Sequence, residues 1–429
     1  MLATTTLILL VLCAASIPVA AALGVLGLAL DQMFSAMPLH RAMGEVIWPG
    51  SNEYLLISIP MFVMLGEVLL RSGIARRVYA AIAQWFSWLP GGLMHANIGT
   101  CTLFAATSGS SVATAATIGT VAIPEIERQR YDARLFLGSV AAGGTLGILV
   151  PPSIIMVLYG LLTDTSVPQL YLAGFIPGFA LAALFMLTIA AACIWRPAWG
   201  GLRLQTSWAE RLRTLPDLVP PVGIFLVVVG SIYAGVATPT EAAALGVIAS
   251  LGLAAWERKL TWPMLAEVLQ GTMRTTAMIM LIILAAKFLN FVLGLIGLTQ
   301  AMTTFFEQLG LGKYGMLLAV IAFYVILGCF MESLSMLITT VPLIAPVMFK
   351  LGFDPVWFGI IVTLLIETAL ITPPVGMNLY VVQGLRRSGS INEVIAGSIP
   401  FVAAMFVLLG LLTAWPELTL WLPNAVMGK

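Results

Sequence analysis

The sequence predicts an all-α polytopic membrane protein built from two repeats that cross the bilayer in opposite directions. Of its 429 residues, 60% are hydrophobic and only 9% are charged, and the mean hydropathy is +1.03. Soluble domains carry about 25% charged residues, so this composition is typical of a chain that lies largely in lipid. An internal duplication and a one-sided distribution of arginine predict the repeats and their inversion.

The duplication relates residues 108–160 to residues 330–382 without a gap. At one fixed offset, polar and proline positions of the first segment recur in the second: Ser111, Thr117, Pro124, Asp132, Pro151 and Pro152 align with Ser333, Thr339, Pro346, Asp354, Pro373 and Pro374. The same offset aligns residues 20–25 with residues 242–247. Internal duplication in a membrane chain points toward transport.

Apolar runs predict the helices that cross the membrane. They lie near residues 3–28, 52–70, 135–160, 169–195, 217–235, 239–256, 275–297, 355–382 and 394–415. No Lys or Arg precedes the first run, and part of it belongs to the repeat. We therefore expect the run 3–28 to be a retained transmembrane helix and not a cleaved signal peptide.

Two longer stretches, 92–124 and 314–349, each contain a polar break at the centre. The breaks are Thr107–Ser111 and Met331–Ser335. Irregular backbone at membrane depth must be covered by protein or wetted. Each stretch is therefore expected to form a re-entrant helical hairpin that enters and leaves on the same side.

With both stretches as re-entrant hairpins, most of the positively charged residues lie on one side of the membrane. Fifteen of the twenty Lys and Arg residues fall on one side: Arg71, Arg76, Arg77, Arg128, Arg130, Arg134, Arg196, Arg203, Arg211, Arg213, Arg258, Lys259, Arg274, Arg386 and Arg387. Arg41, Lys313, Lys350 and Lys429 fall on the other side, and Lys287 lies inside a span. Because cytoplasmic loops are enriched in Lys and Arg, the N-terminus is predicted to be cytoplasmic and the C-terminus periplasmic. The repeats are then inverted.

The two repeats are expected to have equivalent parts. Residues 1–195 form the first repeat, with an interfacial arm helix at 74–89, a hairpin at 92–124 and a broken helix at 135–160. Residues 196–216 form a cytoplasmic connection. Residues 217–429 form the second repeat, with an arm helix at 298–312, a hairpin at 314–349 and a broken helix at 355–382. Both arm segments mix aromatic with polar residues, as interfacial helices do.

Tandem prolines interrupt both broken helices, at Pro151-Pro152 and Pro373-Pro374. Proline has no N–H and blocks the preceding turn, so carbonyl groups are left free near the middle of the membrane. Such carbonyls, with hydroxyl groups from a hairpin tip, can form an oxygen cage for Na⁺. The exposed half-helix N-termini favour an anionic substrate group. The alternative is that the prolines only kink packed helices.

Three ionisable residues within the apolar regions have open roles. Glu332 could complete a cation site, pair with Lys287, take up protons or serve as a structural hydrogen-bonding group. Glu367 has the same alternatives. Lys287 is expected in a structural pair or a subunit interface, with substrate contact as the alternative. Glu67 precedes Arg71 by four residues, which is typical of an ordinary ion pair on a helix surface.

The sequence gives little support for a metal site, for nucleic-acid binding, or for an enzyme or scaffold function. The four cysteines lie in apolar runs without a CxxC pair, and the two histidines are far apart, so neither a disulfide nor a transition-metal site is expected. No basic patch with interleaved aromatic residues suggests nucleic acid. An intramembrane enzyme would need a paired acid and base, for which Glu332 with Glu367 is the candidate. A non-transporting scaffold would not need two symmetric breaks.

The chain resembles the large membrane subunit of tripartite ATP-independent periplasmic (TRAP) transporters, and four sequence segments carry this resemblance. They are Ser108–Ser111, Gly147–Pro152, Thr238–Ala244 and Glu367–Pro374. The resemblance covers essentially the whole chain. It implies an elevator-type fold in the bacterial inner membrane, Na⁺ as the coupling ion, and uptake of a small organic anion such as a C4-dicarboxylate or a sialic acid. It also implies two partners, a small four-helix membrane subunit and a periplasmic substrate-binding protein.

The resemblance places the sodium sites where hairpin tips meet broken helices. In this sequence these positions are Ser108, Ser110, Gly147, Val150 and Pro152 for one site, and Glu332, Ser333, Thr372 and Pro374 for the other. Polar residues beside them are expected to contact the substrate: Ser111, Ser153, Ser335 and Asn378. A stand-alone ion-coupled anion or dicarboxylate symporter of the same architecture is the alternative function.

Overall fold

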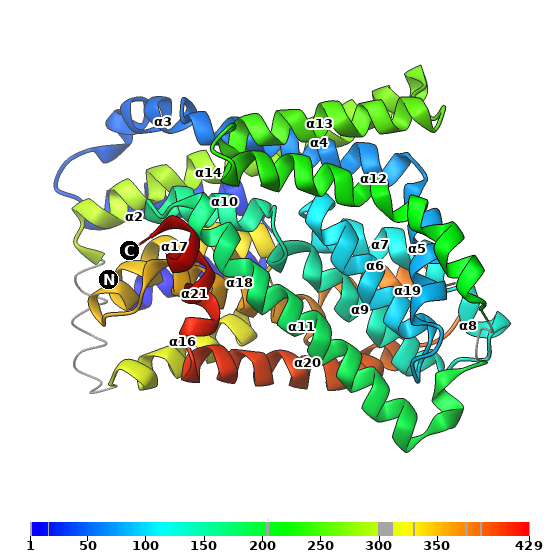
Figure 1. Ribbon diagram of the computed structural model, residues 1–429. Coiled ribbons are helices and arrows are strands. Elements are labelled where there is room, and N and C mark those ends of the chain that lie inside the picture. Colours follow the sequence, from blue (N-terminus) through cyan, green and yellow to red (C-terminus); the bar gives the residue numbers. More distant parts are fainter. Residues whose placement is uncertain are drawn as a thin grey trace.

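The computed structural model describes residues 2–15, 17–202, 206–298, 312–328, 331–373, 376–386 and 388–428. Within these ranges the regular structure is entirely helical. Seven described helices are long and apolar enough to cross a membrane, or eight if one bent pair counts as a single span. The prediction of an all-α polytopic membrane protein is confirmed. Figure 1 shows α3, α4 and α13 along one edge, α20 along the opposite edge, and α9 and α18 between them, with α11 crossing obliquely.

One group of helices packs along the first edge. It is formed by α2 (Val19–Phe34), α3 (Met43–Ser51), α4 (Ser58–Arg71), α12 (Trp208–Tyr233), α13 (Pro239–Trp256) and α14 (Trp262–Leu295). In this group α14 packs on α2, α3 and α4, and α13 packs on α4 and α12. The second half of the expected connection, residues 208–216, is the first part of α12. A capping box starts α12, in which Ser207 and Glu210 satisfy each other's backbone N–H groups.

The second group is built around two fully buried helices. They are α9 (Ala133–Leu149) and α18 (Pro355–Ile371), which are buried at every residue from Leu135 and from Val356 onward. The other members are α6 (Leu93–Ser108), α7 (Ser111–Ala122), α10 (Ile154–Thr163), α11 (Val167–Trp195), α16 (Lys313–Leu327), α17 (Ser333–Lys350), α19 (Met377–Gly384) and α20 (Ile391–Ala414).

Shorter elements complete the described chain. They are α1 (Leu2–Ala14), α5 (Ile74–Phe86), α8 (Glu125–Arg128), α21 (Glu417–Met427) and the 3₁₀ turns Leu39–Ala42, Tyr54–Ile57 and Pro197–Gly200. Helix α5 lies in the range expected for the first arm, and the expected second arm lies almost entirely outside the described residues. Arg77 ties α5 to the first group by ion pairs with Asp217 of α12 and with Glu257 after α13.

The prediction of one helix over residues 3–28 is wrong. The run is divided into α1, which ends at Ala14, and α2, which begins at Val19. Pro18 lies at the division and has no N–H to continue a helix, and the residue before a proline is sterically disfavoured in the helical conformation. High hydropathy alone therefore concealed a helix boundary.

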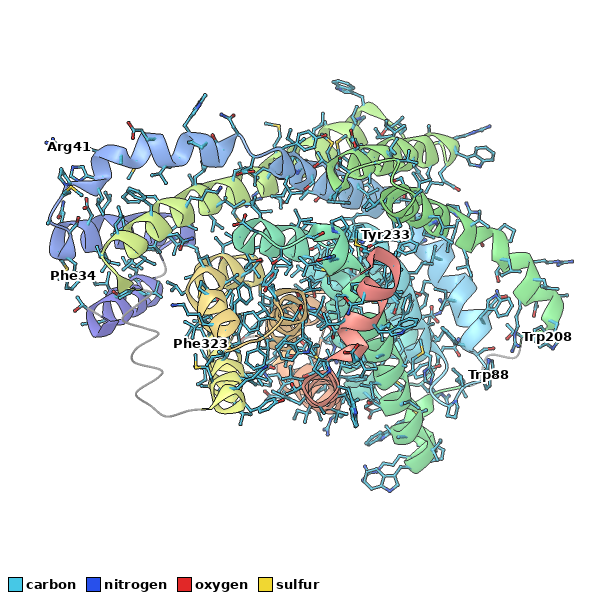
Figure 2. The ribbon with its side chains drawn as sticks, turned by 60° about the vertical axis from the view of Figure 1, so that its left-hand side comes forward. Phe34, Arg41, Trp88, Trp208, Tyr233 and Phe323 are labelled. Carbon is cyan, nitrogen blue, oxygen red and sulfur yellow. The ribbon has the colours of Figure 1, made fainter. Side chains whose placement is uncertain are left out.

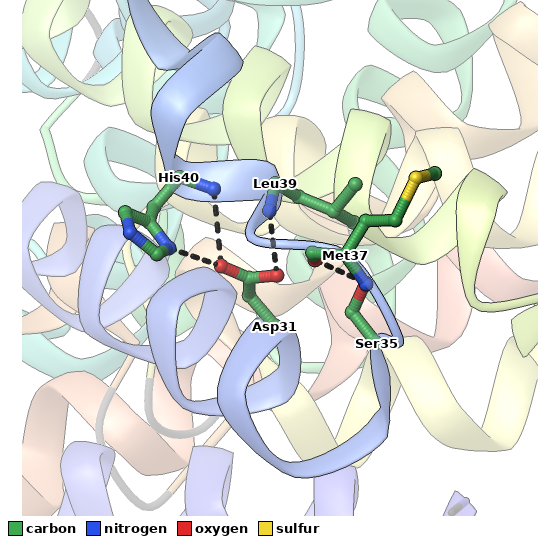
Figure 3. A network of polar contacts seen from close by, with 5 residues as sticks. All are labelled: Asp31, Ser35, Met37, Leu39 and His40. Atoms are coloured by element: carbon green, nitrogen blue, oxygen red, sulfur yellow. Dashed lines mark hydrogen bonds and ion pairs between the residues drawn. The ribbon is translucent and has the colours of Figure 1, made fainter.

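A buried carboxylate closes the turn that follows α2 (Figure 3). Asp31 is 3% exposed and accepts the backbone N–H groups of Leu39 at 2.9 Å and His40 at 3.0 Å. The Nδ1 atom of His40 lies 2.8 Å from the same carboxylate. Figure 2 shows the neighbouring residues Phe34 and Arg41 at one end of the molecule, with Trp88 and Trp208 at the opposite end. The sidedness of these two ends stays a prediction.

The closest packing in the second group joins α9 to α20. A Cβ atom on Gly138 would lie 2.0 Å from the carbonyl oxygen of Gly397, and one on Gly397 would lie 1.8 Å from that of Arg134. The two backbones therefore touch with no room for side chains. This crossing fixes α20 against the helix that carries the first break.

Candidate functional site at the hairpin tips and helix breaks

The first hairpin tip lies directly on the first broken helix. Ser110 caps α7, and its Oγ accepts the N–H of Ala113 at 3.4 Å. Gly147 packs on this tip, because a Cβ atom there would lie 2.7 Å from the Ser110 carbonyl oxygen. On Gly109, with φ of +59°, a Cβ would lie 3.4 Å from the Pro152 carbonyl oxygen. The structure thus brings together Ser110, Gly147 and Pro152 of the first predicted cation site.

The first break separates α9 from α10. Helix α9 ends at Leu149, Val150 is extended, and Ser153 starts α10 by accepting the N–H of Met156 at 3.4 Å. The axes of the two helices differ by 42°. Ser108 is the last residue of α6 and so reaches the same tip. Gly147 of α9 allows the Ser110 carbonyl oxygen to approach the helix backbone closely, as a cation site at a broken helix requires.

The second hairpin tip is organised by Glu332. Its carboxylate accepts the backbone N–H groups of Leu334 and Ser335, each at 3.1 Å, at the start of α17. The hydroxyl groups of Ser333 and Ser335 also donate to it, at 2.8 and 3.3 Å. The carboxylate therefore caps α17, where the helix dipole stabilises its negative charge. Among the described residues, one oxygen atom, Oε1, accepts a single hydrogen bond, from the Ser333 hydroxyl, and retains acceptor capacity.

The second break follows α18. Helix α18 ends at Ile371, and the hydroxyl of Thr372 donates to the carbonyl of Thr368 at 2.6 Å. Helix α19 begins at Met377. Pro374 of the second predicted cation site lies outside the described residues.

The residues expected to contact substrate have different surroundings. Ser111 and Asn378 are bonded to each other, with Asn378 Nδ2 donating to Ser111 Oγ at 2.8 Å. Both are buried, as is Ser153, which caps α10. Ser335 is held by Glu332. Each of the four lies at a tip or a break, but each also has a structural partner there.

A cavity of about 370 Å³ lies where these elements meet. Its lining includes Ser110 and Ser111 from the first tip, Glu332 and Ser333 from the second tip, and Met377 from the start of α19. Ile148 and Ile154 contribute the two sides of the first break. Both tips and both broken helices therefore face one space.

The opposite wall of the cavity was missed by the sequence analysis. It consists of residues from α4 and α14: Val63, Gly66, Glu67, Leu70, Thr275, Met278 and Ile279. The expected Glu67–Arg71 ion pair is present, and Arg71 also bonds Glu267 at 3.2 Å. The sequence feature that pointed to this wall was Glu67, a carboxylate within an otherwise apolar span, which the sequence analysis assigned to an ion pair on the helix surface.

The remaining ionisable residues of the apolar regions, Lys287 and Glu367, have different partners. Lys287 of α14 lies 3.9 Å from Glu53, so its partner is not Glu332. Glu367 is fully buried in α18 and accepts the backbone N–H of Ile148 at 3.2 Å.

Among the described residues, no group of three or more His, Cys, Asp or Glu side chains is placed to hold a metal ion. The site instead offers hydroxyl and carbonyl oxygen atoms, which fit Na⁺.

Comparison with known proteins identifies the family. Over residues 6–418 the chain matches the family described as tripartite ATP-independent periplasmic transporter, DctM component. The chain belongs to this family. It is 34% identical over 387 residues to the C4-dicarboxylate TRAP transporter large permease protein DctM of Pseudomonas aeruginosa, with 90% of each chain covered. It is 31% identical over 383 residues to the sialic acid TRAP transporter large permease protein SiaM of Vibrio cholerae, with 88% of each chain covered.

The fold is also similar to that of a solved transporter. The YdaH transporter of Alcanivorax borkumensis superposes with a TM-score of 0.62 at 15% identity, covering 97% of this chain and 99% of that one. As a TRAP large permease, the chain is a multi-pass protein of the inner membrane that moves a substrate in cooperation with a binding protein and a small membrane subunit. It is a transporter component and not an enzyme.

Proposed function

We propose that this TRAP large permease couples the uptake of a small organic anion to Na⁺ and carries it by an elevator movement. The observation that supports this proposal most strongly is the cavity of about 370 Å³ shared by both hairpin tips and both broken helices. Substrate and coupling-ion sites of inverted-repeat transporters lie at such junctions of discontinuous helices.

The coupling ion is proposed from the donor groups. At the first tip the Ser110 carbonyl oxygen lies against Gly147 with no room for a side chain, and the Pro152 carbonyl oxygen lies beside Gly109. At the second tip Glu332 provides a carboxylate oxygen with free acceptor capacity. Oxygen donors without a transition-metal cluster suit Na⁺, and bound Na⁺ would supply the positive charge that favours an anionic substrate nearby.

The elevator movement is proposed from the two walls of the cavity. One wall belongs to α4 and α14 of the first helix group, and the other belongs to the tips and breaks of the second group. If the second group slides along the first, the cavity can open to one side of the membrane and then to the other. The substrate would travel with the tips while α4 and α14 stay in place.

The partners and the substrate class follow from the family. We propose a small four-helix membrane subunit and a periplasmic binding protein that delivers the substrate, with the N-terminus of this chain cytoplasmic and its C-terminus periplasmic. The relatives include permeases named for C4-dicarboxylates, sialic acid and isethionate, all of which are organic anions. An anionic group is therefore the proposed feature of the substrate.

Reconstituted transport tests the proposal. Proteoliposomes should contain this chain, its small subunit and a binding protein loaded with a C4-dicarboxylate or a sialic acid. Uptake should follow an inward Na⁺ gradient and should not need ATP. Equal uptake with K⁺ replacing Na⁺ on both sides would contradict Na⁺ coupling.

A further inference from the structure

Glu367 lies at the centre of the second broken helix, where nothing so far explains it. It is 0% exposed, and every neighbour in α18 from Val356 to Ile371 is also buried. Burying a carboxylate is costly unless it is fully bonded. A purely structural carboxylate should therefore have partners on both oxygen atoms. Here Oε1 accepts one N–H, and Oε2 has no partner among the described atoms.

The backbone groups that contact Glu367 belong to the other repeat: they are those of Ile148 and of the next residue, Leu149. Oε1 accepts the backbone N–H of Ile148 at 3.2 Å, across 219 positions of sequence. Ile148 is in the last turn of α9, next to Gly147, which packs on the first hairpin tip. Ile148 also lines the shared cavity. A carboxylate on the second broken helix thus holds the turn that meets the first tip.

The position equivalent to Glu367 in the first repeat is Thr145, which cannot make the reciprocal contact. Thr145 is buried, and its hydroxyl donates to the carbonyl of Ala142 within its own helix at 2.7 Å. The link between the broken helices therefore runs in one direction, from α18 to α9. Among the described residues, a side-chain hydrogen bond from the opposite repeat at this level is present at the first site.

We propose that Glu367 is a positioning residue for the first cation site. Its acceptor oxygen holds the N–H of Ile148, and so sets the turn from Gly147 to Pro152 against the Ser110 tip. Shifting that turn changes the distances between the carbonyl oxygen atoms that would surround Na⁺. Glu367 does not itself bind the ion. This inference rests on the Na⁺ coupling proposed above.

Two conservative substitutions of Glu367 separate the effect of side-chain length from the effect of charge. Glu367→Gln keeps the length of the side chain and an acceptor oxygen for Ile148, but it removes the charge. Glu367→Asp keeps the charge but withdraws the acceptor by one methylene group. The proposal therefore predicts that Glu367→Asp is the more damaging change. Glu417→Asp, at the exposed start of α21, is the matched control.

The measurement is the thermal unfolding midpoint of the full chain in lipid nanodiscs, titrated with Na⁺ against K⁺ at constant ionic strength. A ligand that binds the folded state raises this midpoint. We expect Glu367→Asp to raise the half-saturating Na⁺ concentration about tenfold, the scale of losing one buried hydrogen bond. Glu367→Gln should stay within about threefold of the wild type. The midpoint in K⁺ alone reports folding independently of Na⁺ binding.

The outcomes distinguish the inference from the function on which it rests. A wild-type chain without any Na⁺ response would overturn the Na⁺ coupling, and this inference with it. A wild-type response that Glu367→Asp retains in full would overturn the inference alone. An equal loss of Na⁺ affinity in Glu367→Gln and Glu367→Asp would also overturn the inference. The charge of the side chain, and not its length, would then explain the loss.

Discussion

Asn378 donates a hydrogen bond from Nδ2 to the Oγ atom of Ser111 over 2.8 Å, joining residues that are 267 positions apart. The same Nδ2 donates to the carbonyl of Ala141 at 3.2 Å. One amide group therefore ties the second broken helix to the first hairpin tip and to the first broken helix. With the Glu367–Ile148 contact, it makes two polar links between the repeats beside the shared cavity.

The Asn378–Ser111 pair should show measurable coupling in a double-mutant cycle. Each of Asn378→Ala and Ser111→Ala leaves a buried polar partner unsatisfied and should lower the free energy of unfolding by about 1–3 kcal/mol. The double variant should lose less than the sum of the two, by about 0.5–1.5 kcal/mol. Thermal and denaturant unfolding of the detergent-solubilised chain measures this. Strict additivity would show that the two side chains do not interact.

The α9–α20 crossing predicts a severe effect of one methyl group. In Gly397→Ala the new Cβ would overlap the Arg134 carbonyl oxygen, at 1.8 Å. Backbone atoms cannot yield as a flexible side chain can, so the two helices must separate. Overpacking a core costs about 1–3 kcal/mol, and we expect at least this loss in the free energy of unfolding.

Gly410→Ala is the control for that prediction, because it lies on the same helix with nothing within 4 Å of its Cβ position. Replacing glycine by alanine inside a helix stabilises it by roughly 0.5–1 kcal/mol. Gly410→Ala should therefore be neutral or stabilising in the same unfolding assay. Similar behaviour of both variants would contradict the close crossing.

The two hairpin tips should differ in their effect on Na⁺ dependence. Ser110→Ala removes a neutral hydroxyl group, and Glu332→Gln removes a charge. Hydrogen bonds to charged groups are worth about 1.5–3 kcal/mol and neutral ones about 1 kcal/mol. If both groups face the ions, each variant should raise the Na⁺ concentration for half-maximal uptake, and Glu332→Gln should raise it more.

Both tip residues also cap helices, so loss of a cap needs its own control. Ser390→Ala removes the side-chain cap of α20, at an exposed position far along the chain from either tip. It should lower stability by about 1 kcal/mol without changing the Na⁺ dependence. Unchanged Na⁺ dependence in both tip variants, at normal expression, would refute their assignment as cation ligands.

The predicted inversion of the repeats can be tested by labelling. Arg128 and Lys350 are exposed and follow the first and second hairpins. In a chain without its native cysteines, Arg128→Cys should react with a membrane-impermeant reagent only from the cytoplasmic side, and Lys350→Cys only from the periplasmic side. Reaction of both from one side would mean that the repeats are parallel.

The sequence was sufficient for features that depend on local chemistry. Tandem prolines remove backbone donors, so the ends of α9 and α18 were predictable to within a few residues. Polar residues in apolar runs likewise indicated both tips, Ser110 and Glu332. The same local reasoning failed at Pro18, where a single proline within an apolar run also ended a helix. One proline is a weaker signal than two.

The tertiary structure determined which of the candidate polar residues contact one another. Composition and spacing determined the all-helical membrane fold and the candidate polar residues, because both follow from the transfer of side chains and backbone into lipid. Only the packing of α9, α18 and α19 brought Glu367 to Ile148 and Asn378 to Ser111. Only the approach of α4 made Glu67 part of the cavity wall. These contacts join residues far apart in the chain, and their distances depend on how buried helices fit together, which no local pattern encodes.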